Sequence, residues 1–146
     1  MTRAEVSQRH RWMFAKSSPG ETATIQIGNG IDVEPGWFPL LDRVLADLGE
    51  EVRLMTEDQR ARFAIAQIKE KYGELTIYTH GGNDLTAAII EEAEALSRTI
   101  CEQCGAPGSQ VVFAGKWYAT LCAPCAQKDA SERNATVVSA AEFEGT

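Results

Sequence analysis

The chain has 146 residues, 44% of them hydrophobic, and its 21 acidic and 14 basic residues give a net charge of −7. That length suits one domain, with one core and a small attached module. The negative charge argues against broad electrostatic binding to nucleic acid, which needs clustered Lys and Arg. No apolar run approaches the roughly 18 residues that cross a membrane, and residues 1–16 lack the apolar segment of a secretory signal. We therefore expect a cytoplasmic protein.

The N-terminal segment, residues 1–20, is basic. Its cationic side chains are Arg3, Arg9, Arg11 and Lys16. Residues 1–16 allow a short helix, which Ser17-Ser18-Pro19-Gly20 would end. A basic arm with aromatic residues can contact nucleic acid, but a docked or frayed terminus is the more common case. We adopt the second interpretation.

Residues 21–99 predict an α+β core with helices packed on a small, mainly antiparallel sheet. It starts with a hairpin over residues 22–33, because Asn29-Gly30 between alternating apolar residues favours a type I′ turn. From Trp37 the apolar residues recur at helical spacing. We expect Gly49 to end that helix and Val52 and Leu54 to lie in a short strand.

Thr56 and Gln59 match a helix-start capping box. The apolar spacing after them predicts a helix that runs to Gly73, with a hairpin turning near Tyr72-Gly73 as the alternative. Residues 74–80 alternate in polarity, as in a strand.

The last long helix is expected over Leu85 to Thr99, with Asp84 as its cap. Its predicted core-facing stripe consists of Leu85, Ile89, Glu92 or Ala93, Leu96 and Ile100. The exposed side is predicted to be acidic. This helix leads directly into Cys101, so we expect the following module to move with the core.

All four cysteines lie in two Cys-x2-Cys pairs, Cys101 with Cys104 and Cys122 with Cys125. Residues 105–121 separate the pairs, within the roughly 15 to 20 residues typical of a four-cysteine zinc site. Two short strands, at residues 111–113 and 117–121, complete the pattern of a zinc ribbon over residues 100–130. Four thiolates fill a tetrahedral ion, so the predicted Zn²⁺ is structural.

Other roles for these cysteines fit the sequence less well. Disulfides need an oxidising compartment, and a redox site at Cys122-Ala-Pro-Cys125 would need a longer fold after it and would leave the first pair unused. A deaminase needs a His-x-Glu motif, but Gly81-Gly82 follow His80. Four cysteines also suit iron, or can be buried without a ligand. Zinc is our preferred interpretation.

Residues 126–133 allow one or two helical turns. Residues 131–146 are expected to be a loose C-terminal tail, because residues 134–146 are small, polar and acidic.

Three stretches carry a family resemblance: residues 32–42 (DVEPGWFPLLD), residues 67–75 (QIKEKYGEL), and the cysteine segment of residues 100–108 with 117–125. They are similar to a group of small proteins of bacteria and their phages that have a four-cysteine, zinc-ribbon-like module at the C-terminus. The resemblance covers most of residues 30–126. It brings no activity with it, but it implies an accessory protein that binds and redirects a host component.

Three functions are compatible with these patterns. The first is a non-catalytic zinc protein that binds a protein partner, because no nucleophile and base are paired in the sequence. The second is nucleic-acid binding, with Lys116, Trp117 and Tyr118 against bases and Arg11 and Lys16 against phosphates. The third is binding or sequestration of a small ligand such as a nucleotide. Convergence of Arg43, Lys69 and Lys71 on a pocket would favour the third.

Overall fold

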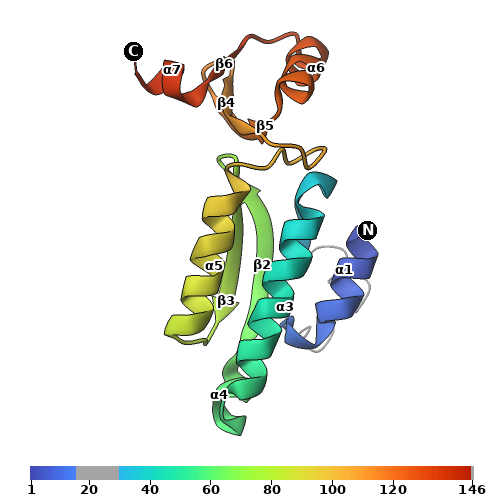
Figure 1. Cartoon of the computed structure of the whole chain (residues 1–146), viewed down its shortest axis with the longest axis vertical. Coiled ribbons are helices and arrows are strands. Elements are labelled where there is room, and N and C mark those ends of the chain that lie inside the picture. The colour runs from blue at the N-terminus through green and yellow to red at the C-terminus, as the bar shows by residue number, and fades with distance from the viewer. Residues whose placement is uncertain (16–29, 146) are drawn as a thin grey trace, which may run out of the picture.

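The computed structural model describes residues 1–15 and 30–145. It has an α+β fold with two small sheets, as expected from the sequence (Figure 1). In chain order the elements are α1 (Arg3–His10), η1 (Arg11–Met13), β1 (Ile31–Asp32), η2 (Pro35–Trp37), α3 (Phe38–Leu54), α4 (Glu57–Arg62), β2 (Ala64–Lys71), β3 (Glu74–His80), α5 (Asp84–Ser97), β4 (Ser109–Phe113), β5 (Trp117–Leu121), α6 (Ala123–Arg133), β6 (Val137–Ser139) and α7 (Ala140–Glu144).

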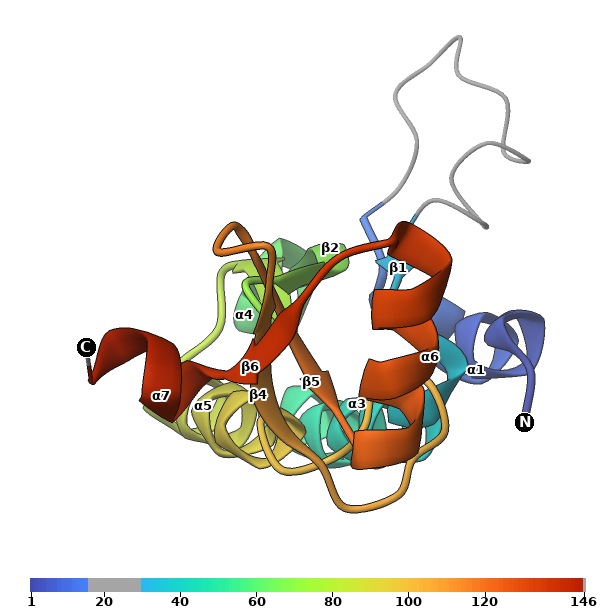
Figure 2. The same ribbon diagram turned by 90° about the horizontal axis from the view of Figure 1, so that it is seen from above.

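The larger part, residues 3–15 and 30–97, is built on the sheet β1-β2-β3 and is called here the core body. Strand β2 pairs antiparallel with β3 and parallel with β1. Helices α3 and α5 lie side by side on one face of this sheet (Figures 1 and 2). The apolar stripe predicted for α3 is buried, since Trp37, Leu41, Leu45 and Leu48 have no exposed surface. This burial of α3 against the sheet forms the main core.

Helix α5 covers the free edge of β3. The hydroxyl of Ser97 accepts a hydrogen bond from the Leu75 N–H at 2.9 Å, and the Glu94 carboxylate accepts one from the Ile77 N–H at 3.2 Å. Burial raises the pKa of Glu94, and the Ile77 N–H opposes that shift. Because an uncovered edge strand invites pairing with other chains, these two bonds protect the sheet.

Helix α1 docks on α3, as favoured for the N-terminal segment. Val6 and Met13 are buried. The carboxylate of Asp42 contacts Arg9 at 2.9 Å and His10 at 2.8 Å. Apolar burial and charged contacts thus both hold the N-terminal helix in place.

The smaller part, residues 101–144, is called here the cysteine module and lies beyond one end of the core body (Figure 1). Its sheet has the order β5-β4-β6, all antiparallel, and Phe113 and Leu121 are buried against α6. The stretch expected to be a loose tail instead forms β6 and α7. Val111 to Phe113 of β4 pair with residues 137–139, so that part of the expectation is wrong.

Two other expectations for the first half of the chain are also wrong. Helix α3 continues through Gly49 to Leu54, so residues 52–54 are not a strand. A Cβ atom at Gly49 would lie 3.2 Å from the Trp12 ring and 3.6 Å from Met13. This glycine lets η1 approach α3 closely, and that tertiary contact could not be read from the local pattern.

After the Thr56 capping box, which is present, the chain forms only the short α4 and then β2. The predicted long helix is wrong and the alternative hairpin is confirmed, with Tyr72 and Gly73 at positive φ. Strand β2 has a register irregularity between Ile65 and Gln67, so Ile65 and Ile68 are both fully buried. A bulge of this kind gives a strand the three-residue spacing of a helix, which explains the wrong prediction.

The hairpin predicted over residues 22–33 lies mostly outside the described residues. Its described end, β1, pairs in parallel with β2, with Ile31 opposite Ile68. Helix α5 is confirmed, although Asn83 rather than Asp84 caps it. Its predicted inward stripe is confirmed at Ala93, which is buried, and at Ile89 and Ile100, which pack against the core. It is wrong at Leu85 and Leu96, which are 59% and 39% exposed. Within the described parts of the chain, no helix combines the length and apolar character needed to span a bilayer.

Candidate metal centre

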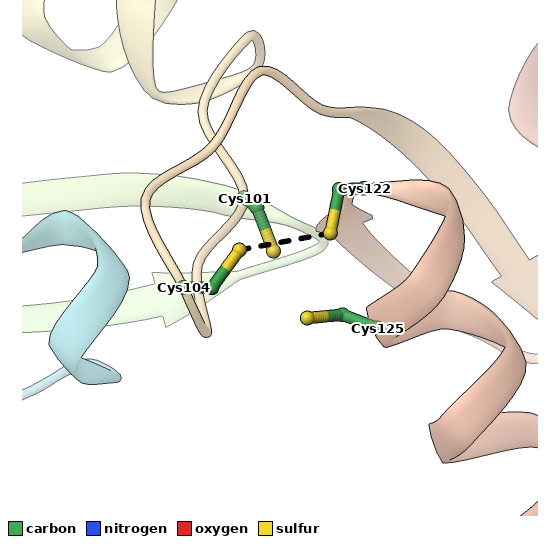
Figure 3. Close-up of side chains that lie close together, drawn as sticks. All are labelled: Cys101, Cys104, Cys122 and Cys125. Atoms are coloured by element: carbon green, nitrogen blue, oxygen red, sulfur yellow. Dashed lines mark hydrogen bonds between the residues drawn. The ribbon is translucent and has the colours of Figure 1, made fainter.

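The four cysteines come together from two segments (Figure 3). Cys101 and Cys104 lie in the turn that precedes β4, and Gly105, at φ +82°, gives that turn the left-handed residue expected after a cysteine knuckle. The second pair lies at the start of α6. Cys122 is the N-cap, and Cys125 is in the first turn. The β4-β5 hairpin between the pairs folds the two segments toward each other.

The sulfur positions fit one tetrahedral ion. All four Sγ atoms lie within 4.8 Å of one another, and those of Cys104 and Cys122 are 3.6 Å apart. Four ligands at a Zn–S distance of about 2.3 Å would be separated by about 3.8 Å. A disulfide requires about 2.05 Å, and the four thiols are free. The donor set and its spacing therefore suit a Zn²⁺ ion.

The surroundings of the four cysteines shift the pKa values of individual thiols. Burial opposes ionisation of Cys101, but backbone N–H groups of Cys122, Cys104 and Gln103 outweigh it and lower the pKa of Cys101 to about 7. Contact with the Cys122 thiol raises the pKa of Cys125. A bound cation reverses such a rise, because a coordinated thiol loses its proton. The N-terminus of α6 also favours negative charge at Cys122 and Cys125.

The first knuckle is bonded directly to the core body. The Gly36 N–H donates to the Glu102 carbonyl and the Trp37 Nε1–H donates to the Ile100 carbonyl, each at 2.8 Å. A Cβ atom at Gly36 would overlap the Cys101 carbonyl oxygen. The cysteine knuckle can therefore reach its place only because residue 36 is a glycine.

A second link runs through β5. The carboxylate of Glu102 accepts a hydrogen bond from the Thr120 N–H at 3.1 Å, and the Thr120 hydroxyl donates to the Gly73 carbonyl at the β2-β3 turn. Burial raises the pKa of Glu102 to about 7, despite that hydrogen bond, and the negative charges of Glu70, Cys101 and Glu34 add to the rise. Thr120 of β5 thus joins the turn that carries Cys101 and Cys104 to the β2-β3 hairpin of the core body.

The residues proposed to hold nucleic acid do not gather on one face. Trp117 and Tyr118 are successive residues of β5, so their side chains point to opposite faces of the sheet. The Arg133 guanidinium covers one face of the Trp117 ring, 4.9 Å from its centroid. Arg11 lies in η1, at the end of α1 that points away from the cysteine module (Figure 1), and Lys16 lies outside the described residues.

The residues proposed for a small ligand are also separated. Arg43 lies in a groove between α3 and α5. Lys69 stacks over the Tyr78 ring at 5.5 Å, on the face of β2 opposite to the buried Ile68. Lys71 is on that same outer face. Within the described residues, the sheet thus separates Lys69 and Lys71 from the groove that Arg43 lines.

Sequence reasoning missed an aromatic face, made of Tyr72, Tyr118 and Phe143. The Tyr118 ring meets both others edge to face, with centroids 6.4 Å apart in each pair. Tyr72 is 69% exposed and Phe143 is 40% exposed. These residues come from the core hairpin, β5 and α7, so no local pattern could have joined them.

Comparisons of the chain with protein-family models, with curated proteins and with solved structures found no match.

Proposed function

We propose that this protein is a non-catalytic zinc protein whose metal fixes a surface for a protein partner. The observation that carries the proposal is the cluster of four thiols within 4.8 Å. With Cys101, Cys104, Cys122 and Cys125 as ligands, a tetrahedral Zn²⁺ has no open position for substrate or water. The ion then acts on the fold alone.

The aromatic face is the part of the surface that such an ion would stabilise. Tyr118 lies on β5, between the two cysteine pairs, and Phe143 lies on α7, which packs on β4. Tyrosine and phenylalanine are enriched at protein interfaces, where they supply large contact areas at a low entropic cost. Zinc would hold these rings next to Tyr72 of the core hairpin.

The resemblance to small bacterial and phage proteins suggests the kind of partner. An accessory factor of this type would bind a protein of the host cell. The negative charge of the chain is compatible with a protein partner and disfavours nucleic acid.

The experiment is affinity capture from a bacterial lysate by the wild-type chain and by Tyr118→Ala and Phe143→Ala. Leu54→Ala is the matched control, because Leu54 is 79% exposed at the far end of α3. We expect one defined partner whose recovery falls at least tenfold in the two aromatic variants and is unchanged in the control. Equal recovery by all four proteins, or no specific partner, contradicts the proposal.

Nucleic-acid binding is a second candidate with one observation in its favour. Lys69 stacks on Tyr78, whose ring is partly exposed, and Lys71 is exposed on the same strand face. Aromatic and cationic groups on a sheet are the usual elements of single-strand recognition. Fluorescence anisotropy with a labelled single-stranded oligonucleotide tests this. Binding that weakens steeply with salt and is lost in Tyr78→Ala supports it, and no binding at low salt excludes it.

A further inference from the structure

Helix α5 packs Ile89 and Ile90 partly against the core but leaves two leucines outside it. Its buried residues are Thr86, Ala93 and Ser97, all small. Leu85 and Leu96 are 59% and 39% exposed. A surface helix usually turns its largest apolar residues to the core, so two leucines left outside on one line of the helix form an apolar stripe that remains to be explained.

This stripe borders a groove along the seam between α3 and α5. Leu40 and Val44 of α3 and Ile89 and Leu96 of α5 supply its apolar lining, and Arg43 and Glu92 are among its charged residues. Its volume is about 90 Å³, well below the roughly 300 Å³ at which small-molecule sites begin. Protruding side chains of a protein can occupy such a space, whereas a nucleotide cannot.

None of the described elements covers this face. In Figure 1 the seam faces the viewer, with the sheet behind it, α1 on the far side of α3 and the cysteine module beyond one end. Figure 2 shows the same two helices at the edge of the core body that is turned away from β2. Among the described elements, therefore, none blocks the seam.

We propose that the occupant is a second copy of this chain, packed face to face about a twofold axis across the α3-α5 seam. The stripe is symmetric along α5. Positions 85 and 96 are equally far from the midpoint of positions 89 and 92. Two antiparallel α5 helices would therefore place Leu85 against Leu96 of the other copy twice, as an isologous contact requires.

The charges argue for the same occupant. Glu92 lies within the apolar stripe, where this pairing sets it opposite Ile89 of the other copy and about one turn from the other Glu92. Two α5 helices alone would therefore leave two carboxylates close together without a cation. Arg43 lines the same groove and forms no ion pair within the part of the chain that the structure describes. Across the twofold axis, Arg43 of each copy can meet Glu92 of the other. A basic partner would be opposed by Arg43 and an acidic one by Glu92, but a second copy offers both signs in matching order.

The proposal concerns a surface separate from the aromatic face and does not depend on the function proposed above. Sedimentation equilibrium of the purified full chain over a range of concentrations gives its mass directly. We expect twice the 15.9 kDa of one chain at high concentration and a reversible fall toward 15.9 kDa on dilution. A mass of one chain at every concentration overturns the proposal.

Three variants then locate the contact. Leu96→Glu should abolish the dimer, whereas Leu54→Glu, at a more exposed leucine outside the groove, should leave it unchanged. Arg43→Glu should raise the dissociation constant of the dimer at least tenfold, because it places a second carboxylate next to Glu92 of the other copy. Adding Glu92→Arg to Arg43→Glu should restore an ion pair between positions 43 and 92, with the charges exchanged. Arg43 and Glu92 are exposed, so these two changes leave the fold intact, which far-UV circular dichroism verifies. A dimer that is insensitive to Leu96→Glu, or a double variant no better than Arg43→Glu, refutes this interface.

Discussion

The core body and the cysteine module are stabilised in different ways. In the core body, α3 alone buries seven large side chains, namely Phe38, Leu40, Leu41, Val44, Leu45, Leu48 and Val52. The module buries far less apolar surface, around Phe113 and Leu121, and its helix α6 contributes only alanines. A unit this small usually needs a metal or disulfides to fold. The core body should therefore survive without zinc, and the module should not.

The largest expected effect is the loss of a metal ligand. Cys101→Ser replaces a fully buried thiol and removes one of four ligands, so the module should lose its zinc and unfold. Metal binding supplies about 10 kcal/mol or more of folding free energy in small zinc domains. Zinc content and limited proteolysis within residues 101–144 report on the module, and far-UV circular dichroism reports chiefly on the core helices. Ser109→Ala, at an exposed position of β4, is the control.

Removal of zinc from the wild-type protein with a chelator should likewise unfold the cysteine module and leave the core body folded. If the whole far-UV signal collapses on zinc removal, the core body is not independent of the metal and the comparison fails.

A substitution inside the core body should lower the stability of the core without affecting zinc binding by the module. Leu48 has no exposed surface, and Leu48→Ala should lower the free energy of unfolding by about 2–5 kcal/mol through lost burial and a cavity. Zinc stoichiometry of the folded protein should stay unchanged. Denaturant titration measures the loss, with Leu54→Ala as the exposed control. If Leu48→Ala released zinc while still folded, the core body and the cysteine module would not be stabilised independently.

Trp37→Phe tests the bond between the two parts. It keeps an aromatic ring in the core but leaves the Ile100 carbonyl without its indole donor, which costs about 1–3 kcal/mol when the site is buried. We expect both parts to lose stability and the module to unfold before the core. Trp12→Phe is the control, because Trp12 is 47% exposed. Equal stability of Trp37→Phe and wild type would show that this link does not couple them.

The smallest effect concerns pH and Glu94. Its pKa is raised in the folded protein, chiefly by burial, so the folded state favours the protonated form. That contribution is fully present below the unfolded pKa of about 4.3 and is lost as the pH rises through the higher folded value. Glu94→Gln should therefore become more stable relative to wild type as the pH rises from 4 to 7. Denaturant titrations across this range measure it, with the exposed Glu50→Gln as control, and a flat difference would contradict the assignment.

How far the sequence predicted the structure also differs between the two parts. In the module, ligand spacing and the turn between two short strands are local signals, and the cysteine cluster and the β4-β5 hairpin agree with them. In the core body, the bulge at Ile65 imitated a helix, and Gly49 was taken for a helix end although its role is close packing against Trp12. Both errors arise from tertiary contacts that no local window contains.

The aromatic face and the outward stripe of α5 were beyond prediction for a related reason. Tyr72, Tyr118 and Phe143 meet only once the hairpin of the core body packs on β5. For α5 the spacing of Leu85 and Leu96 was read correctly, but periodicity does not say which side faces the core. The exposed fractions decide that.

The most direct test of the structural zinc is elemental analysis combined with native mass spectrometry of the purified chain and of its four single Cys→Ser variants. The account predicts one zinc per chain in a colourless wild-type protein and loss of zinc from each variant. Iron in place of zinc, a wild-type protein without metal, or unchanged zinc in the variants at Cys101, Cys104, Cys122 and Cys125 would contradict it.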